Sequence, residues 1–284
     1  MKSTTWLWVA AVAITLTAVI YQRQTGPTYP KKVSINLDDK EIQMKLLRSH
    51  DVDSTLVIII PGLSYEWSAN LYYRKYPTNE EWSMMPFMIN EKGEMMSQLP
   101  SDQPKAGKLE YYIELSNPLT DKTLKIPEDE PIVIRFKGSV PAWALLPHIV
   151  FIFFAMLFSN LAGALALFKH PKFKFYGMLT LILMLLGGMI FGPIVQKFAF
   201  DAYWTGFPFG ADLTDNKTLI AFIFWLLAVV LNQKKERPWA TILAAAVTLI
   251  VFSIPHSLRG SEFNYETGEV VTGFINYLAG IISL

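Results

Sequence analysis

The chain has 284 residues, 52% of them hydrophobic, with a mean hydropathy of +0.29 and a formal net charge of +1. Its length allows one large domain or two small ones. A net charge this close to zero offers no basic surface for nucleic acid, and the sequence has neither a phosphate-binding loop nor a dinucleotide fingerprint. We therefore expect no nucleic-acid or nucleotide partner. The absence of cysteine excludes disulfides, cysteine-ligated zinc and c-type haem attachment.

The apolar residues are unevenly distributed along the chain. Residues 24–139 carry 14 Lys/Arg and 17 Asp/Glu, a net charge of −3, as in an ordinary soluble domain. The remaining residues hold 11 basic and 7 acidic side chains, mostly in loops between apolar runs. This division predicts an N-terminal anchor helix over 1–23, a β-domain over 24–139 and a helical bundle over 140–284.

The first apolar segment, Trp6–Ile20, is short for a membrane span. Its fifteen residues extend roughly 22 Å as a helix, less than the ~30 Å hydrocarbon core. Such a length suits a cleaved signal peptide as well as a signal anchor. No small-x-small cleavage signal follows Tyr21, which favours the uncleaved anchor.

Residues 30–138 contain short runs rich in β-branched and aromatic residues between turn signals, which predict strands. The eight predicted strands are Lys32–Leu37, Glu41–Arg48, Thr55–Pro61, Asn70–Tyr76, Ser83–Asn90, Glu94–Leu99, Lys108–Ser116 and Pro131–Lys137. In the last strand Ile132, Ile134 and Phe136 alternate with polar residues and share one face. Eight such strands indicate an all-β sandwich.

The same region carries a Trp82-x-x-x-Pro86 strand, then Leu99-Pro100, then Ala106-Gly-Lys-Leu-Glu-Tyr-Tyr-Ile113. This succession resembles the immunoglobulin-like or fibronectin-type-III-like modules of bacterial surface proteins. The resemblance covers residues 30–138 and its motifs are loose. It implies a sandwich that serves as a spacer or a binding module, and it implies no catalytic residue.

Aromatic residues in this region allow two interpretations. Either they form a ligand platform, or alternate ones lie in the core and the rest cover a sheet face, which is the favoured interpretation. The six residues are Tyr65, Trp67, Tyr72, Tyr73, Tyr76 and Trp82.

Long apolar runs then crowd the C-terminal half, and each predicts a transmembrane helix. The four runs are Trp143–Phe168, Phe175–Val195, Thr218–Leu231 and Trp239–Ile254. A shorter run, Val270–Leu284, predicts a short C-terminal membrane helix, although periodicity does not decide whether it crosses. The expected fold class is an α+β membrane protein: an anchor helix, an extracytoplasmic all-β sandwich and a bundle of four transmembrane helices plus this short one.

The basic residues of the helical half gather in two short loops and at the N-terminus. They are Lys2, Lys169, Lys172, Lys174, Lys234, Lys235 and Arg237, accompanied by one acid, Glu236. Because cytoplasmic loops are enriched in Lys and Arg, this side faces the cytoplasm. We therefore expect a multi-pass protein of the bacterial plasma (inner) membrane with a cytoplasmic N-terminus and an extracytoplasmic β-domain.

Small and polar residues within the apolar runs predict how the helices pack. Gly188 and Gly192 form a GxxxG pattern, which we assign to packing within the bundle rather than to a dimer face. Pro193 should kink or end the third run. The Asn160 amide, which follows Ser159 in mid-membrane, must find an interhelical partner because lipid offers none.

The outer loops hold the candidate functional residues. Helices begin or end there, so we expect several ionisable side chains to line one polar pocket at the outer membrane boundary. These residues are His148, Asp201, Asp212, Asp215, Lys217, His256, Arg259 and Glu262.

Each of these residues also has a structural interpretation. Asp212-x-x-Asp215 is close to a capping box and predicts the start of a helix. Asp201 with Lys197 is a candidate surface ion pair. His148 and His256 could ligate one metal ion or one b-type haem, but the favoured interpretation of both is structural.

No HExxH, GxSxG or other complete catalytic motif is present in the sequence. The outer loops 204–217 and 254–262 resemble those of uncharacterised bacterial inner-membrane proteins, which implies no activity. We expect a non-enzymatic accessory or binding protein whose partners are the lipid bilayer and another membrane or extracytoplasmic protein. The alternatives are a haem- or metal-binding redox protein using His148 and His256, and a small-solute transport component.

Overall fold

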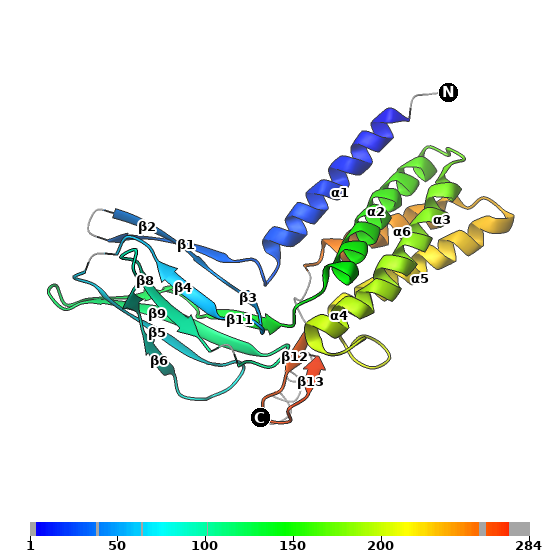
Figure 1. The fold of residues 1–284 in the computed structure, drawn as a ribbon. Coiled ribbons are helices and arrows are strands. Elements are labelled where there is room, and N and C mark those ends of the chain that lie inside the picture. The colour runs from blue at the N-terminus through cyan, green and yellow to red at the C-terminus, as the bar shows by residue number, and fades with distance from the viewer. Residues whose placement is uncertain (1–3, 38–39, 64, 101, 256–259, 273–284) are drawn as a thin grey trace. The chain divides into compact units, whose positions relative to one another are not determined.

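The computed structural model describes residues 4–37, 40–63, 65–100, 102–255 and 260–272. Over these residues the fold is α+β, with several sheets and four helical stretches that are long and apolar enough to cross a membrane (Figure 1). It divides into two compact units. The helical unit comprises residues 1–27, 140–261 and 271–284, and the β unit comprises residues 28–139 and 262–270.

The helical unit consists of helices joined by short connections. Its elements are α1 (Thr5–Thr25), α2 (Ala142–Leu167), α3 (Phe173–Met184), the π-helical segment η1 (Leu185–Phe191), α4 (Gly192–Phe200), α5 (Leu213–Lys234) and α6 (Pro238–Ser253). The four long apolar stretches are α1, α2, the run from α3 through η1 to α4, and α5; α6 is shorter.

Two helices extend beyond the apolar runs that predicted them. α1 has 21 residues rather than fifteen because the polar segment from Tyr21 to Thr25 continues the helix. The helix is therefore roughly 32 Å long, although its apolar run is still the fifteen residues Trp6–Ile20. α5 begins at Leu213 instead of Thr218 because the Asp212 side chain caps it.

Within the helical unit, α2 packs against α1, α3 and α6. Small residues let the helices approach closely: a Cβ added to Gly163 of α2 would lie 2.6 Å from the Ala245 Cβ of α6. The Asn160 amide of α2 donates to the Thr15 hydroxyl of α1 at 2.9 Å, which is an interhelical bond of the predicted kind. Large apolar side chains face outward on every long stretch, for example Val9, Val150, Ile182 and Leu227.

Side-chain contacts show which connections share one end of this unit. Trp6 at the start of α1 makes an edge-to-face contact with Phe168 at the end of α2, with ring centroids 4.9 Å apart. Lys174 at the start of α3 pairs with Glu236 in the α5–α6 connection at 3.2 Å. The basic loops and the start of α1 therefore lie at the same end.

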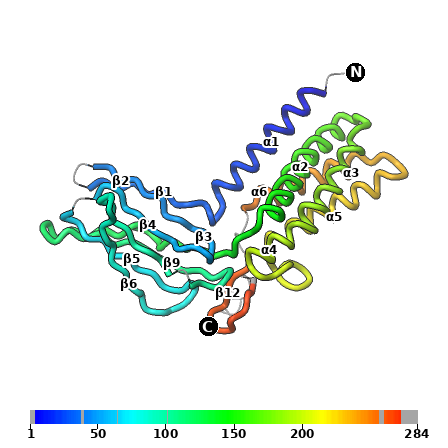
Figure 2. Tube along the Cα trace, in the orientation of Figure 1, coloured from blue at the N-terminus to red at the C-terminus, as the bar shows by residue number. Residues whose placement is uncertain are grey.

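Pro193 does not end the third apolar run, although the sequence allowed either a kink or an end at this residue. It continues through η1 and α4 as one path to Phe200 (Figure 2). In η1 the Gly192 N–H donates to the Gly187 carbonyl five residues earlier. This wider turn precedes Pro193 in the first turn of α4, where a missing N–H is tolerated.

The β unit contains short strands that belong to several sheets. Their bounds are β1 (Lys31–Leu37), β2 (Lys40–Leu46), β3 (Ser49–Asp51), β4 (Leu56–Ile60), β5 (Ser68–Lys75), β6 (Ser83–Pro86), β7 (Met88–Ile89), β8 (Met95–Leu99), β9 (Lys108–Asn117), β10 (Lys122–Ile126) and β11 (Ile132–Lys137). β1 pairs with β2, and β4, β8 and β7 form a second sheet. The largest sheet has the order β3-β11-β9-β5-β6, with β10 also on β9.

One hydrophobic core joins these three sheets. Inward residues alternate along the strands: Leu109, Tyr111, Ile113 and Leu115 of β9 are all buried. The Tyr111 hydroxyl, which burial would otherwise leave without a partner, donates to the Leu47 carbonyl at 2.9 Å. These four residues therefore form the inner face of β9.

The predicted strand Ser83–Asn90 is split in two at Phe87. β6 pairs with β5 in the large sheet, whereas β7 pairs with β8 in the three-stranded sheet. The Phe87 N–H donates to the Ala69 carbonyl at the crossing point. The segment thus passes from one sheet to the other and cannot be one continuous strand.

A second segment of the chain, residues 262–270, completes the β unit, and we call it the strap. The sequence reading placed these residues with the helices. The Tyr265 hydroxyl accepts from the Lys108 N–H at 3.0 Å and donates to the Lys108 carbonyl at 2.8 Å. Gly107 makes room for this ring, since an added Cβ there would lie 3.0 Å from the same hydroxyl.

The strap overlaps two strands, β12 (Ser261–Phe263) and β13 (Val270–Thr272), which pair with each other. The expected C-terminal membrane helix over Val270–Leu284 is therefore wrong for its first three residues, which form β13. Residues 273–284 lie outside the described part of the chain.

Candidate functional site

The start of α5 holds a buried polar cluster built around Asp212. One carboxylate oxygen, Oδ1, accepts from the Thr214 and Asp215 N–H groups at 2.7 and 3.3 Å, which is a helix N-cap. The other, Oδ2, accepts from the N–H and hydroxyl of Ser261 at 3.0 and 3.2 Å, and from the Thr205 hydroxyl at 3.2 Å. The capping pattern seen in the sequence is thus realised, and the same side chain fixes two loops.

Asp215 and Lys217 complete this cluster. Asp215 accepts from the Thr205 N–H at 2.7 Å. Lys217, only 2% exposed, donates to the Ile254 carbonyl at the end of α6 at 2.7 Å. Apart from the N-cap bonds of Asp212, these contacts tie the start of α5 to a neighbouring loop or helix end. The cluster therefore fixes the fold of this end of the helical unit.

Asp201 and Glu262, two further residues of the predicted pocket, are not part of this cluster. Asp201, in the left-handed conformation at φ 64°, ends α4 and pairs with Lys197 at 2.9 Å on the surface. Glu262 belongs to the β unit, where it pairs with Lys108 at 3.2 Å. Burial lowers the pKa of Lys108, and the Glu262 carboxylate opposes that shift. His256 and Arg259 lie outside the described residues.

His148 lies on α2, and its surroundings are apolar. Its Nδ1 is 2.8 Å from the Gly187 carbonyl of η1. A carbonyl only accepts, so Nδ1 carries the proton and donates it. Any metal or haem ligation by this residue would therefore have to use Nε2. In the described part of the chain no three His, Asp or Glu side chains group as they would around a metal ion.

His148 lines a pocket of about 170 Å³ between α1, α2 and α6. Its other lining residues are Ala18, Val19, Gln22, Ile149, Ile152, Phe153, Met156 and Phe252. Gln22 donates through Nε2 to the Phe252 carbonyl at 2.8 Å and to the Ile254 carbonyl at 3.3 Å. These contacts satisfy carbonyls at the end of α6 that have no partner within the helix.

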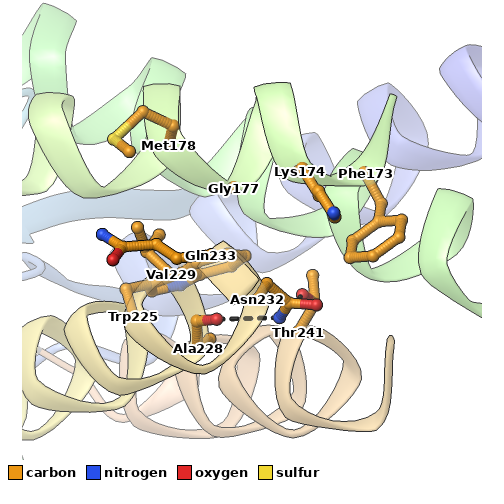
Figure 3. Close-up of a pocket in the computed structure, with 10 residues that line it drawn as sticks. All are labelled: Phe173, Lys174, Gly177, Met178, Trp225, Ala228, Val229, Asn232, Gln233 and Thr241. Carbon is orange, nitrogen blue, oxygen red and sulfur yellow. Dashed lines mark hydrogen bonds between the residues drawn. The ribbon is translucent and has the colours of Figure 1, made fainter. Parts of the chain in front are cut away.

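A second pocket, of about 190 Å³, lies between α3, α5 and α6 near the basic loops (Figure 3). Asn232 and Thr241 are buried polar residues that line it. The Asn232 amide donates to the Ala228 carbonyl at 2.7 Å and accepts from the Arg237 N–H at 2.7 Å. Because both ends of this amide are already bonded, Asn232 holds the α5–α6 connection and offers little to a ligand.

The aromatic residues of the β unit divide between core and surface. Trp67 is buried in the core and Tyr73 packs against it. Tyr72 stacks on Tyr112 of β9 at 4.9 Å on the outer face, and Trp82 meets Tyr112 edge-on at the same centroid distance.

Basic side chains cover this outer aromatic group. Arg74 lies over the Trp82 ring at 4.5 Å and Lys125 lies over the Tyr112 ring at 4.7 Å. Since these contacts occupy ring faces, we interpret the group as a self-contained cation–π cluster rather than an open platform.

Strands β4, β6, β7 and β8 carry a group of exposed or half-buried methionine and isoleucine side chains, which we call the methionine edge. Its residues are Ile59, Met84, Met85, Met88, Ile89 and Met96. Met96 lies directly opposite both Ile59 and Met88 in the three-stranded sheet, so these three form a row across its outer face. Met88 is 71% exposed. The sequence did not predict this surface, because the residue pattern of the Ser83–Asn90 segment does not show which of its side chains face solvent.

A scan of protein-family models and a search of curated proteins give no match to this sequence.

Proposed function

We propose that the chain is a multi-pass protein of the bacterial plasma (inner) membrane that binds a protein partner through the methionine edge of its β unit. Membrane insertion is supported by the length and composition of four helical stretches. It is also supported by the apolar side chains that face outward from them, because soluble helices turn such residues inward.

The orientation follows from the charges at one end of the helical unit. The contacts of Trp6 with Phe168 and of Lys174 with Glu236 support a common end for the start of α1 and the two basic loops. By the positive-inside rule this end faces the cytoplasm. The β unit, whose residues connect to the other ends of α1 and α2, is then extracytoplasmic.

For the β unit we propose an immunoglobulin-like sandwich. A single core shared by the large sheet and the two smaller sheets supports two layers packed face to face. Such modules commonly act as spacers or binding domains, which fits an accessory protein.

The methionine edge is the observation that carries the binding role. Ile59, Met96 and Met88 form an apolar row across one sheet face, and exposed apolar surface marks interaction sites. Methionine is enriched at interfaces because its flexible side chain adapts to the partner. Both β6 and β7 end their sheets here, and edge strands offer backbone groups to a partner strand. We therefore expect a protein partner with an apolar, extended segment.

A photo-crosslinking amino acid at Met88 tests this role in intact cells. Leu119 in the β9–β10 turn is the matched control, because it is 74% exposed and apolar but not part of the edge. We expect one defined adduct from position 88 and none from position 119, and Ile59→Lys should reduce the adduct. Equal adducts from both positions, or none from either, would refute the proposal.

The redox alternative with His148 and His256 needs a separate measurement. An absorption spectrum and elemental analysis of the purified full chain would detect a bound haem or metal. A Soret band that disappears in His148→Ala, while the helical content is kept, would favour that alternative.

A further inference from the structure

We propose that the pocket between α1, α2 and α6 binds a lipid-soluble molecule through a hydroxyl group on its headgroup. The proposal rests on the bilayer placement of the helices and is independent of partner binding at the β unit. Its basis is the pair of hydrogen-bonding groups, His148 and Gln22, among otherwise apolar pocket walls.

The hydrogen bond to Gly187 determines which atom His148 can offer to a ligand. In a neutral imidazole that donates through Nδ1, the other nitrogen, Nε2, is an acceptor. The Nδ1 and Cε1 atoms are also those nearest to Gly192, so this edge of the ring faces the third apolar stretch. No described residue hydrogen-bonds Nε2, which leaves it for the pocket that His148 lines.

Gln22 offers the second acceptor. Its Nε2 already donates to the Phe252 and Ile254 carbonyls, which fixes the orientation of the amide. Its Oε1 has no hydrogen-bond donor among the described residues. A pocket with two acceptors and no donor selects a ligand that brings its own donors, and a hydroxyl group is the simplest such donor.

The pocket walls and volume describe the rest of the ligand. Seven of the nine lining side chains are apolar. A volume of about 170 Å³ is below the ~300–1,000 Å³ of a site that encloses a drug-sized ligand. We infer that a hydroxyl-bearing headgroup enters the pocket while an alkyl chain remains in the surrounding lipid.

A purely structural role for His148 needs only the hydrogen bond from Nδ1 to Gly187, whereas ligand binding also needs the acceptor Nε2. A variant that keeps the first and loses the second therefore separates the structural role from the binding role. His148→Asn keeps an N–H donor near the Nδ1 position for the Gly187 carbonyl but has no acceptor at the Nε2 position. This variant should therefore fold and lose the ligand. His148→Leu, which also loses the bond to Gly187, reports the structural contribution through its thermal stability.

The experiment measures equilibrium binding to the full chain in lipid nanodiscs. The probes are decylhydroquinone, its dimethyl ether, which has the same framework without hydroxyl donors, and a monoacylglycerol. We expect saturable binding of the hydroquinone or the monoacylglycerol, and affinity about tenfold lower for the ether and for His148→Asn, which corresponds to one lost hydrogen bond. Tighter binding of the hydroquinone would indicate a redox carrier as the natural ligand, and tighter binding of the monoacylglycerol would indicate a membrane lipid.

Several results would overturn the proposal. They are equal affinity for the hydroquinone and its ether, unchanged binding of the hydroxyl probe by His148→Asn, and no saturable binding of any probe. Photo-crosslinking from Met88 should be the same in wild type and His148→Asn, so failure of this proposal is distinguishable from failure of the partner-binding role.

Discussion

At the scale of single residues, two adjacent glycines control how the third apolar stretch packs. A Cβ added to Gly187 would lie 2.8 Å from the Phe151 Cβ and 3.0 Å from the Ile152 nitrogen of α2. A Cβ added to Gly188 would lie 2.7 Å from the Thr218 side chain of α5. The absence of both side chains lets this stretch approach α2 and α5 together, and it brings the Gly187 carbonyl within reach of His148.

Gly187→Ala should therefore destabilise the helical unit. The clash with the α2 backbone costs about 1–3 kcal/mol, as for other overpacked sites. Gly192→Ala is the matched control, because its Cβ would have no neighbour closer than 3.5 Å. Thermal unfolding in nanodiscs measures both variants, and similar melting temperatures for the two would contradict this packing.

Tyr265 makes the stability of the β unit depend on alkaline pH. Burial raises the pKa of its hydroxyl from an ordinary value of 10 to about 12. A group whose pKa is raised by folding stabilises the folded state fully below its unfolded pKa. That contribution is lost as the pH rises from about 10 through 12.

Tyr265→Phe should show this dependence in urea unfolding of a fragment that joins residues 28–139 to the strap by a flexible linker. At pH 8 the variant loses two hydrogen bonds to Lys108 and should be less stable by about 1–3 kcal/mol. Between pH 10 and 12 the difference should shrink, because only the wild type loses stability through this hydroxyl. A difference that stays constant from pH 8 to 12 would exclude this role.

At the scale of secondary-structure elements, local patterns predicted most helices and the longer strands. Continuous apolar runs gave α2 and α6 to within a few residues, and strict alternation gave β9 and β11. The ends were less predictable because they depend on caps and on polar turns that continue a helix, as in α1. The three-residue strand β3 has too few side chains to show a period, and it pairs with β11 from a distant part of the sequence.

In the candidate site, too, the sequence predicted local interactions but not the partners that come from distant segments. The spacing of Asp212 and Asp215 predicted a helix cap because that interaction is local. The partners Thr205 and Ser261 are hydroxyl residues that come from other loops, and no local pattern distinguishes them from ordinary loop residues. Glu262 was assigned to the same pocket from its position in the sequence, yet it pairs with Lys108 in the β unit.

The strap is an element whose contribution can be measured directly. The fragment 28–139 with the strap attached should unfold at higher urea concentration than the fragment 28–139 alone, because the strap contributes the Lys108–Glu262 ion pair and the bonds of Tyr265. Attaching the strap with Glu262→Gln and Tyr265→Phe is the control, and it should give little of this gain. If the urea midpoint of the fragment 28–139 is the same with and without the strap, these contacts contribute nothing to its stability.

At the scale of the whole molecule, the testable property is the topology in the membrane. Reporter fusions after Phe173 and Lys235 should report the cytoplasm, since both positions lie at the end that carries the basic loops. Fusions after Lys122 and Phe209 should report the outer side. A single reversed reporter among the four would contradict the proposed orientation.

The strap also gives the chain an order of maturation. A ribosome completes residues 28–139 first, and the segment between Ser139 and Glu262, which contains α2 to α6, takes roughly 6 to 25 s more at ~5–20 residues per second. During that interval the nascent β unit lacks Glu262 and Tyr265, so Lys108 has neither its acidic partner nor its phenol. The β unit therefore reaches its final form only after α6 has been synthesised, and a chain terminated before the strap is recognisable by its incomplete β unit.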